Sequence, residues 1–150
     1  MASSNWRLYN SAKEYIGDGT IDLDSDTFNI ILCNSSSNAA TLSTTTYGGL
    51  TGELATASGY TQTGLALTTT WTNSSGTLTF DATSDVSWLA NGGDLGAYYA
   101  VILDDTATND ELVCYSLLDT TPSLVTASDG YPFNIAFSAS GIFTVGGGTA

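Results

Sequence analysis

Histidine is absent from this chain, and basic residues are almost absent. Of its 150 residues, only Arg7 and Lys13 are basic, against 15 acidic residues, which gives a net charge of −13. Without histidine, Ser-His-Asp and Cys-His catalytic arrangements and histidine-ligated metal sites are excluded. With two cations, the chain has almost nothing to neutralise phosphates with. We therefore expect no nucleic-acid partner and no binding to anionic membrane surfaces.

Cysteine and long hydrophobic runs are also scarce. Cys33 and Cys114 each lie in an apolar run without CxxC spacing, so we expect buried free thiols, although a disulfide between paired strands is also open. The longest apolar run, 95–103, falls far short of the roughly 20 residues of a membrane helix. The N-terminus lacks the apolar stretch of a signal peptide, so we expect a soluble protein made in a cytoplasm.

Hydroxyl-bearing and aromatic residues take the place of charge. The sequence contains 24 Thr and 18 Ser, whereas charged residues make up 11%, against about 25% in an average soluble protein. A hydrophobic fraction of 42% is too high for a disordered chain. Enrichment in Thr, Tyr, Phe, Trp and Val favours strands over helices.

The pattern along the chain predicts an all-β protein. We expect an antiparallel β-sandwich or jelly roll of about eight strands, with a short N-terminal helix or arm at 6–17 that Asn5 caps and Gly17 ends. A polar loop is expected at 34–52 and a hairpin turn at 73–76. The division is an arm at 1–20, a sandwich domain at 21–145 and a tail at 146–150. The expected strands are 27–33, 65–72, 77–81, 86–89, 95–103, 111–118, 133–138 and 141–145.

Acidic residues provide two candidate chemistries, and each has a simpler explanation. Asp22, Asp24 and Asp26 begin like a calcium loop, but Thr27 and Cys33 stand where that loop needs Gly and Glu. We therefore expect a solvated turn, with no metal and no cofactor. A glycosidase would need two facing acids. The candidate acids lie in turns or at strand ends, and nothing marks out two of them as a facing pair. These acids are Asp81, Asp85, Asp104, Asp105 and Asp119. We therefore expect no enzymatic activity.

Aromatic residues suggest binding surfaces. Trp71, Trp88, Tyr98 and Tyr99 could form a carbohydrate-stacking platform, although core packing is the commoner role for such rings. The N-terminal segment has apolar residues on more than one side, so it either packs across the sandwich or inserts into a neighbouring subunit. If it inserts, the interface residues are Trp6, Arg7, Leu8, Tyr9, Lys13 and Tyr15.

The segment 5–24, NWRLYNSAKEYIGDGTIDLD, resembles the opening of a family of small virion structural proteins of tailed bacteriophages. That opening has the form LYNxxKEYxxDGTIDLDxDxF. Three later stretches, 59–61, 80–88 and 138–143, also follow the family pattern, so the resemblance runs from about residue 5 to 145. The chain departs from it at 96–99, where related chains often carry a basic residue.

The resemblance implies a non-enzymatic, β-rich decoration (cement) protein on the exterior of the phage head. Such proteins bind the major capsid protein where shell subunits meet, commonly as homodimers or homotrimers. A tail-associated role and a carbohydrate-binding adhesion module are the alternatives. Synthesis in the host cytoplasm and residence in the virion follow from the same resemblance.

Overall fold

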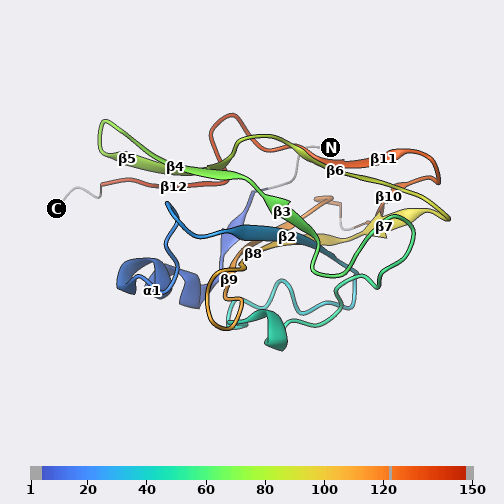
Figure 1. The fold of residues 1–150 in the computed structure, drawn as a ribbon, viewed down its shortest axis with the longest axis horizontal. Helices are drawn as coiled ribbons and strands as arrows, with labels where there is room; N and C mark the ends of the chain where they lie inside the picture. The colour runs from blue at the N-terminus through green and yellow to red at the C-terminus, as the bar shows by residue number, and fades with distance from the viewer. Residues whose placement is uncertain (1–4, 122, 148–150) are drawn as a thin grey trace.

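The computed structural model describes residues 5–121 and 123–147. Across these residues the chain forms twelve strands, one α-helix and one 3-10 helix, and all strand pairs are antiparallel (Figure 1). The helices are α1 (Asn10–Asp18) and η1 (Tyr47–Gly49). The strands are β1 (Arg7–Leu8), β2 (Phe28–Cys33), β3 (Leu65–Leu67), β4 (Thr69–Ser74), β5 (Thr77–Ala82), β6 (Val86–Leu89), β7 (Leu95–Ala97), β8 (Tyr99–Asp104), β9 (Leu112–Leu117), β10 (Val125–Ala127), β11 (Pro132–Ile135) and β12 (Phe143–Val145).

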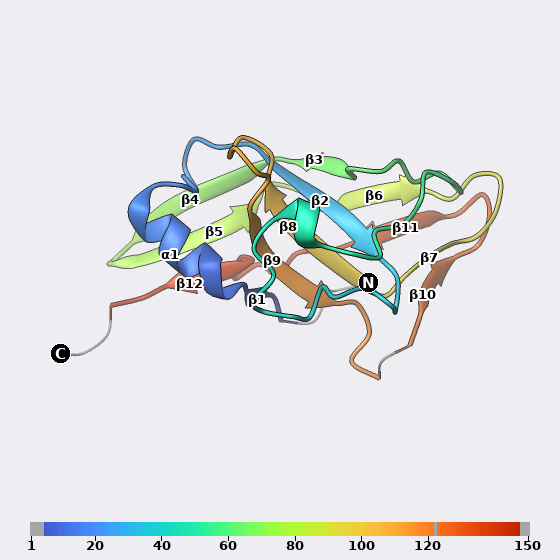
Figure 2. The same ribbon diagram turned by 90° about the horizontal axis from the view of Figure 1, so that it is seen from below.

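A five-stranded sheet in the order β1-β9-β8-β2-β3 lies in the middle of the molecule. One of its faces is covered by β12-β5-β4 and the pair β11-β6, and the other by α1 and the long loop that follows β2 (Figures 1 and 2). The central strands β2, β8 and β9 are buried on both faces, which is why they read as continuous apolar runs. The predicted all-β sandwich is confirmed.

Aromatic contacts join the layers. Phe28 of β2 meets Phe80 of β5 edge-on at a centroid separation of 5.1 Å, and Phe80 also packs on Phe143 of β12 at 5.2 Å. On the opposite face, Tyr9 packs against Tyr115 of β9 at 5.7 Å. Because strand residues alternate between faces, β2 and β9 contribute to both cores.

Two expected strands are each divided by a change of layer. The predicted strand 65–72 is divided at Thr68: β3 pairs with β2 in the central sheet, whereas β4 pairs with β5 in the covering sheet. The predicted strand 95–103 is divided at Tyr98, where β7 leaves to pair with β10 and β8 continues beside β2. Strands that change sheets in this way make the corners of a sandwich.

The hairpin turn predicted at 73–76 is confirmed in its position. Ser74 pairs with Thr77, and the two residues between them, Ser75 and Gly76, have φ values of 52° and 86°. Positive φ at both central residues matches the right-handed twist of the flanking strands.

The N-terminal helix is shorter than predicted and starts later. Trp6 does not begin it: Arg7 and Leu8 are extended and pair with Tyr115 and Cys114 of β9. The helix begins at Asn10, so Asn5 does not cap it. It passes through Gly17 and ends at Asp18. Gly19, with a φ of 84°, caps it by donating its N–H to the carbonyl of Tyr15. Pairing with the edge of β9 outweighs the helical spacing of the apolar residues.

Candidate functional site

The proposed N-terminal interface residues divide between the core and the surface. Tyr9 is buried, and its hydroxyl donates to the Ala39 carbonyl at 2.7 Å. Leu8 and Tyr15 are half-buried against the core. Arg7 and Lys13 are exposed. The arm thus packs across its own sandwich, and the assignment of these residues to an interface stays a prediction.

Trp6, which directly precedes β1, makes a stacking contact. Its indole lies 5.8 Å from the Phe137 ring at an interplanar angle of 15°. Its Nε1–H is buried and meets no acceptor among the described residues. Trp6 therefore fastens the segment before β1 to the one that follows β11.

The four aromatic residues proposed as a carbohydrate platform do not lie in one plane. Trp88 is buried and packs against Tyr60 at 6.1 Å and Phe133 at 6.3 Å. Tyr98 and Tyr99 meet at 65°, edge to face. Trp88 therefore belongs to the core, and these residues do not form the coplanar surface that stacking on a sugar requires.

The acidic triplet Asp22, Asp24 and Asp26 forms a hydrogen-bonded turn before β2. Asp22 Oδ1 accepts the Asp24 N–H at 3.0 Å, and hydrogen bonds from the Ser25 side chain and from Asp24 lower the pKa of Asp22. Asp24 is exposed. Asp26 Oδ2 accepts the Asp22 N–H at 2.7 Å, and the Asp26 carboxyl also interacts with that of Asp104 at the end of β8. Within 5–121 and 123–147, no three His, Cys, Asp or Glu side chains gather as a metal-binding group.

The environment of Asp104 was not predicted from the sequence. It is fully buried, and burial, followed by the Asp26 carboxyl, raises the pKa of Asp104 to about 7. An acid with a raised pKa beside a second acid is a common feature of functional sites. Their separation by 78 positions left no local pattern from which the pair could be predicted. Neither residue lines any of the five surface grooves described for this structure.

A second buried network fixes the long loop after β2. Glu53 accepts hydrogen bonds from the hydroxyls of Tyr47 and Tyr60 and, at 2.7 Å, from the Thr63 N–H. Tyr60 in turn accepts from the Leu32 N–H of β2 at 3.2 Å. Burial, assisted by Glu53, raises the pKa of Tyr47 to about 12. This network is structural, since all its members are used in holding the loop against the sheet.

Both cysteines of the chain are buried free thiols, as the sequence analysis favoured. Cys33 ends β2 and Cys114 lies in β9, and β8 runs between these two strands. Burial raises the pKa of Cys33 to about 12 and also raises that of Cys114. Neither thiol is activated for nucleophilic chemistry.

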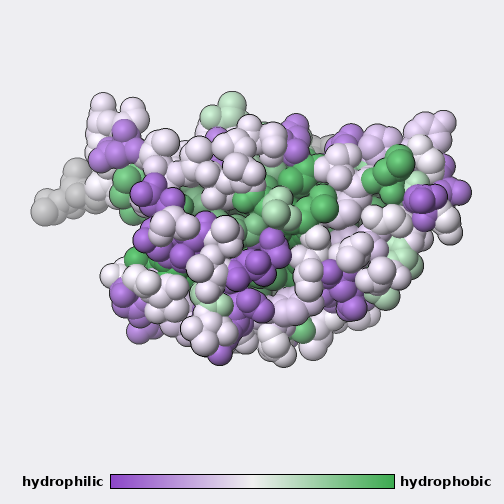
Figure 3. All heavy atoms as spheres, in the orientation of Figure 1, coloured by the Kyte–Doolittle hydropathy of each residue, from purple (hydrophilic) through white to green (hydrophobic). Residues whose placement is uncertain are grey.

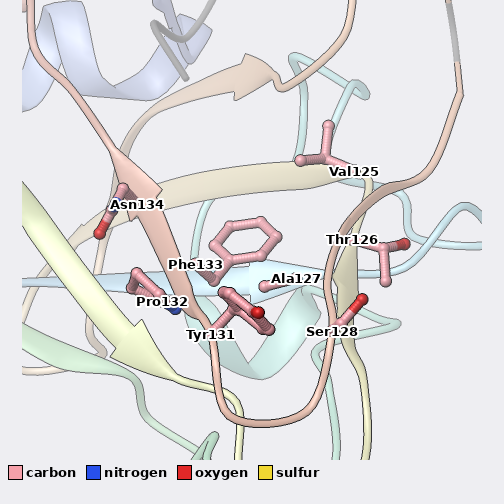
Figure 4. A pocket seen from close by; sticks show the side chains of 8 residues that line it. All are labelled: Val125, Thr126, Ala127, Ser128, Tyr131, Pro132, Phe133 and Asn134. Carbon is pink, nitrogen blue, oxygen red and sulfur yellow. The ribbon is translucent and has the colours of Figure 1, made fainter.

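An open groove lies between β10 and β11 (Figure 4). It is a groove of about 390 Å³, with the buried ring of Phe133 at its base and the exposed ring of Tyr131 beside it. Figure 4 shows both rings projecting toward Ala127. Within the described residues, β10 is hydrogen-bonded to β7 and β11 to β6.

Three large apolar side chains are exposed on elements at this end of the molecule. Tyr131 is 66% exposed, Leu89 at the end of β6 is 59% exposed and Leu124 before β10 is 57% exposed. We call these three residues together with the groove the contact end. Hydrophobic atoms reach the surface at the end formed by β6, β7, β10 and β11, and also over β3 (Figure 3). The sequence offered no sign of this surface, because single exposed apolar residues look like core residues.

The charge on the contact end is acidic. Asp129 Oδ1 accepts the Gly92 N–H at 2.9 Å, and Asp94 Oδ1 accepts the Asp129 N–H at 2.9 Å. Both basic residues, Arg7 and Lys13, belong to the N-terminal segment. The contact end therefore offers apolar surface with acidic residues nearby.

Comparisons with family models, with curated proteins and with solved structures find no match for this chain. No helix among the described residues is long and apolar enough to span a membrane.

Proposed function

We propose that this chain is a structural protein of a tailed-phage virion, a decoration (cement) protein that binds the major capsid protein on the exterior of the head. The observation that carries the proposal is the contact end, where Tyr131 lines the groove and Leu89 and Leu124 are exposed on other elements at the same end. Large exposed apolar residues next to a polar rim are typical of protein-binding surfaces. The resemblance of segment 5–24 to phage virion proteins suggests the major capsid protein as the partner.

The chemistry of the surface favours binding over catalysis. The groove between β10 and β11 is lined by apolar, hydroxyl and amide side chains, without an acid or a base. Asp26 and Asp104, the acids that interact at the end of β8, are not among the residues that line this groove. A contact protein needs shape and apolar area, and the contact end offers both.

Binding would stabilise the shell by mass action. A protein that binds the closed shell and not its free subunits lowers the free energy of the closed state at every occupied site. At a concentration 100 times its Kd, each site contributes about 2.7 kcal/mol. Many equivalent sites add together, and self-association into a homodimer or homotrimer would add avidity.

The net charge of this chain limits which surfaces of the shell it can bind. A net charge of −13 repels other acidic proteins, so the site on the shell must be neutral or basic where Asp94 and Asp129 approach it. Contact with the shell is then made mainly by the apolar groove.

The test is binding to heads purified from a phage that lacks this protein. We expect the wild-type chain to bind and to protect the heads against heat and chelators. The double variant Leu89→Ser/Tyr131→Ser should bind at least 30-fold more weakly, since each hot-spot residue contributes roughly 2 kcal/mol. Val145→Ser is the matched control, because Val145 is 44% exposed on β12, away from the contact end.

Equal binding by the double variant and the control would remove the contact end from the interface. Failure of the wild-type chain to bind heads, with binding to tails or to glycans instead, would favour the tail-associated or carbohydrate-binding alternative. Exposed Arg7 and Lys13 are tested separately by Arg7→Ala/Lys13→Ala. Deletion of residues 1–16 would not serve, because it removes β1 and the buried Tyr9 from the core.

A further inference from the structure

A second groove, of about 360 Å³, lies at the β1 edge of the five-stranded sheet, beside the long loop that follows β2. Strand register builds its floor. Arg7 of β1 pairs with Tyr115 of β9, and Tyr99 of β8 pairs with Leu117 of β9. Because residues two apart on a strand share a face, these four side chains lie on one face of the sheet. The residues that line the groove are Asn5, Arg7, Ala40, Tyr99, Tyr115 and Leu117.

Arg7 brings a positive charge to this groove that the protein itself does not neutralise. The chain carries 15 acidic residues and one other cation, Lys13. Even so, the Arg7 side chain makes no ion pair or hydrogen bond with any residue of 5–121 or 123–147. A guanidinium group presents its N–H donors in a planar fork that fits the two oxygens of a carboxylate. Arg7 therefore offers the groove a free group for binding an anion.

Tyr115 independently indicates a ligand. Only 7% of this residue is exposed, and its ring contacts Tyr9 at 5.7 Å and Tyr99 at 6.2 Å between centroids. Its hydroxyl makes no hydrogen bond with the described part of the chain, yet it is not sealed in the core, because the residue lines the groove. The hydroxyl of a buried tyrosine usually finds a partner. Here that partner has to come from the groove.

We propose that this groove binds a small organic carboxylate. The Arg7 guanidinium donates two N–H···O bonds to the carboxylate, and the Tyr115 hydroxyl donates a further hydrogen bond to it. The rings of Tyr99 and Tyr115, together with Leu117, form an apolar wall for the rest of the ligand. Burial, followed by the neighbouring Tyr98 and Tyr115, raises the pKa of Tyr99, so its hydroxyl stays protonated and can also donate.

Charge and size select this class of ligand. One guanidinium with neutral hydroxyl donors matches a single negative charge, whereas a net charge of −13 disfavours a phosphate dianion. The volume of the groove falls within the range of about 300–1,000 Å³ that is usual for small-molecule sites.

This site is separate from the contact end. The groove belongs to β1, β8 and β9, and none of Leu89, Leu124 and Tyr131 lines it. The inference therefore does not rest on binding to phage heads.

The experiment is an NMR titration of the isotope-labelled full chain with benzoate at pH 7 and constant ionic strength. We expect saturable chemical-shift changes centred on Arg7, Tyr99 and Tyr115, with a Kd of roughly 1 mM for a ligand this small. Benzamide has the same shape without the charge and should bind at least about 10-fold more weakly. Acetate, which lacks the ring, and inorganic phosphate should also bind more weakly than benzoate.

Three variants assign the binding groups. Arg7→Gln should weaken benzoate binding at least about 10-fold, because it removes the charged donor. Lys13→Gln is the matched control, since it removes the same charge from an exposed residue of α1 that does not line the groove, and it should keep the wild-type Kd. Tyr115→Phe should weaken binding at least about 5-fold and leave Tm unchanged, because the lost hydroxyl has no hydrogen-bond partner among the described residues.

The proposal is overturned if benzoate gives no saturable shifts, if benzamide binds as tightly as benzoate, or if phosphate binds more tightly. It is equally overturned if Arg7→Gln keeps the wild-type Kd or if Lys13→Gln weakens binding as much as Arg7→Gln does. A Tyr115→Phe variant that binds benzoate like the wild-type chain would also contradict it. None of these outcomes depends on binding to heads.

Discussion

Tyr9→Phe tests whether the N-terminal segment is part of the core. The substitution removes the hydroxyl that donates to the Ala39 carbonyl at 2.7 Å across 30 residues of chain, and it leaves the ring packed on Tyr115. Because Ala39 is also buried, its carbonyl loses its partner inside the protein. A buried acceptor left unpaired costs about 1–3 kcal/mol.

That loss corresponds to a fall in Tm of roughly 2–12 °C for a chain of this length. The measurement is thermal and urea unfolding of Tyr9→Phe beside Tyr131→Phe, which removes a hydroxyl from a ring that is 66% exposed. The control should change stability by less than about 0.5 kcal/mol. Equal stability of the two variants would contradict the burial of Tyr9. A stable Tyr9→Phe that fails to assemble with its partner would instead support the interface predicted for this residue.

Three further substitutions and conditions test the packing. Gly64→Ala should unfold the loop after β2, because a Cβ at this position would lie 1.9 Å from the Ile30 carbonyl oxygen. Gly76→Ala, at a similar φ but in open space, should lower the free energy of unfolding by only about 1 kcal/mol. Equal urea midpoints for the two variants would refute the close approach at Gly64. Phe80→Ala should lower the free energy of unfolding by about 3–5 kcal/mol, and a loss below 1 kcal/mol would refute the sandwich contact. The pKa of Tyr47 is about 12 in the folded state, against an ordinary value of 10. Its contribution to the free energy of unfolding is therefore complete below pH 10 and should be lost as the pH rises toward 12. In the same series of unfolding measurements, Tyr47→Phe should lose less stability over this pH range.

Most strands could be predicted because their signals are local. The alternation in 77–81 and the turn at Ser75–Gly76 indicate a half-buried hairpin. The apolar run before Asp104 reports equally directly on a strand buried on both faces. In these segments neighbouring residues alone decide the structure.

Other features depend on contacts between distant residues and have no local signal. The change of layer at Thr68 leaves the alternation intact, because both strands keep the same period. The extended β1 exists because the edge of β9 is free to pair with it, which helical spacing in Trp6–Gly17 cannot reveal. Tyr9 was predicted as an interface residue for the same reason: the sequence does not show that Ala39 lies beneath it.

The candidate site was harder to predict than the fold. Asp104 was interpreted as one of five solvated acids in turns or at strand ends, whereas it is fully buried at the end of β8. Asp26, which interacts with it, was assigned to a solvated turn. Only the register between β2 and β8 brings them together. The contact end likewise requires knowledge that Leu89 and Tyr131 face solvent while their neighbours Trp88 and Phe133 face the core.

An image of intact phage particles, labelled on this protein, tests the central proposal most directly. The account expects the label in a regular array over the outer surface of the head, at positions where shell subunits meet. Label confined to the tail, or particles that carry none, would contradict the assignment as a head decoration protein.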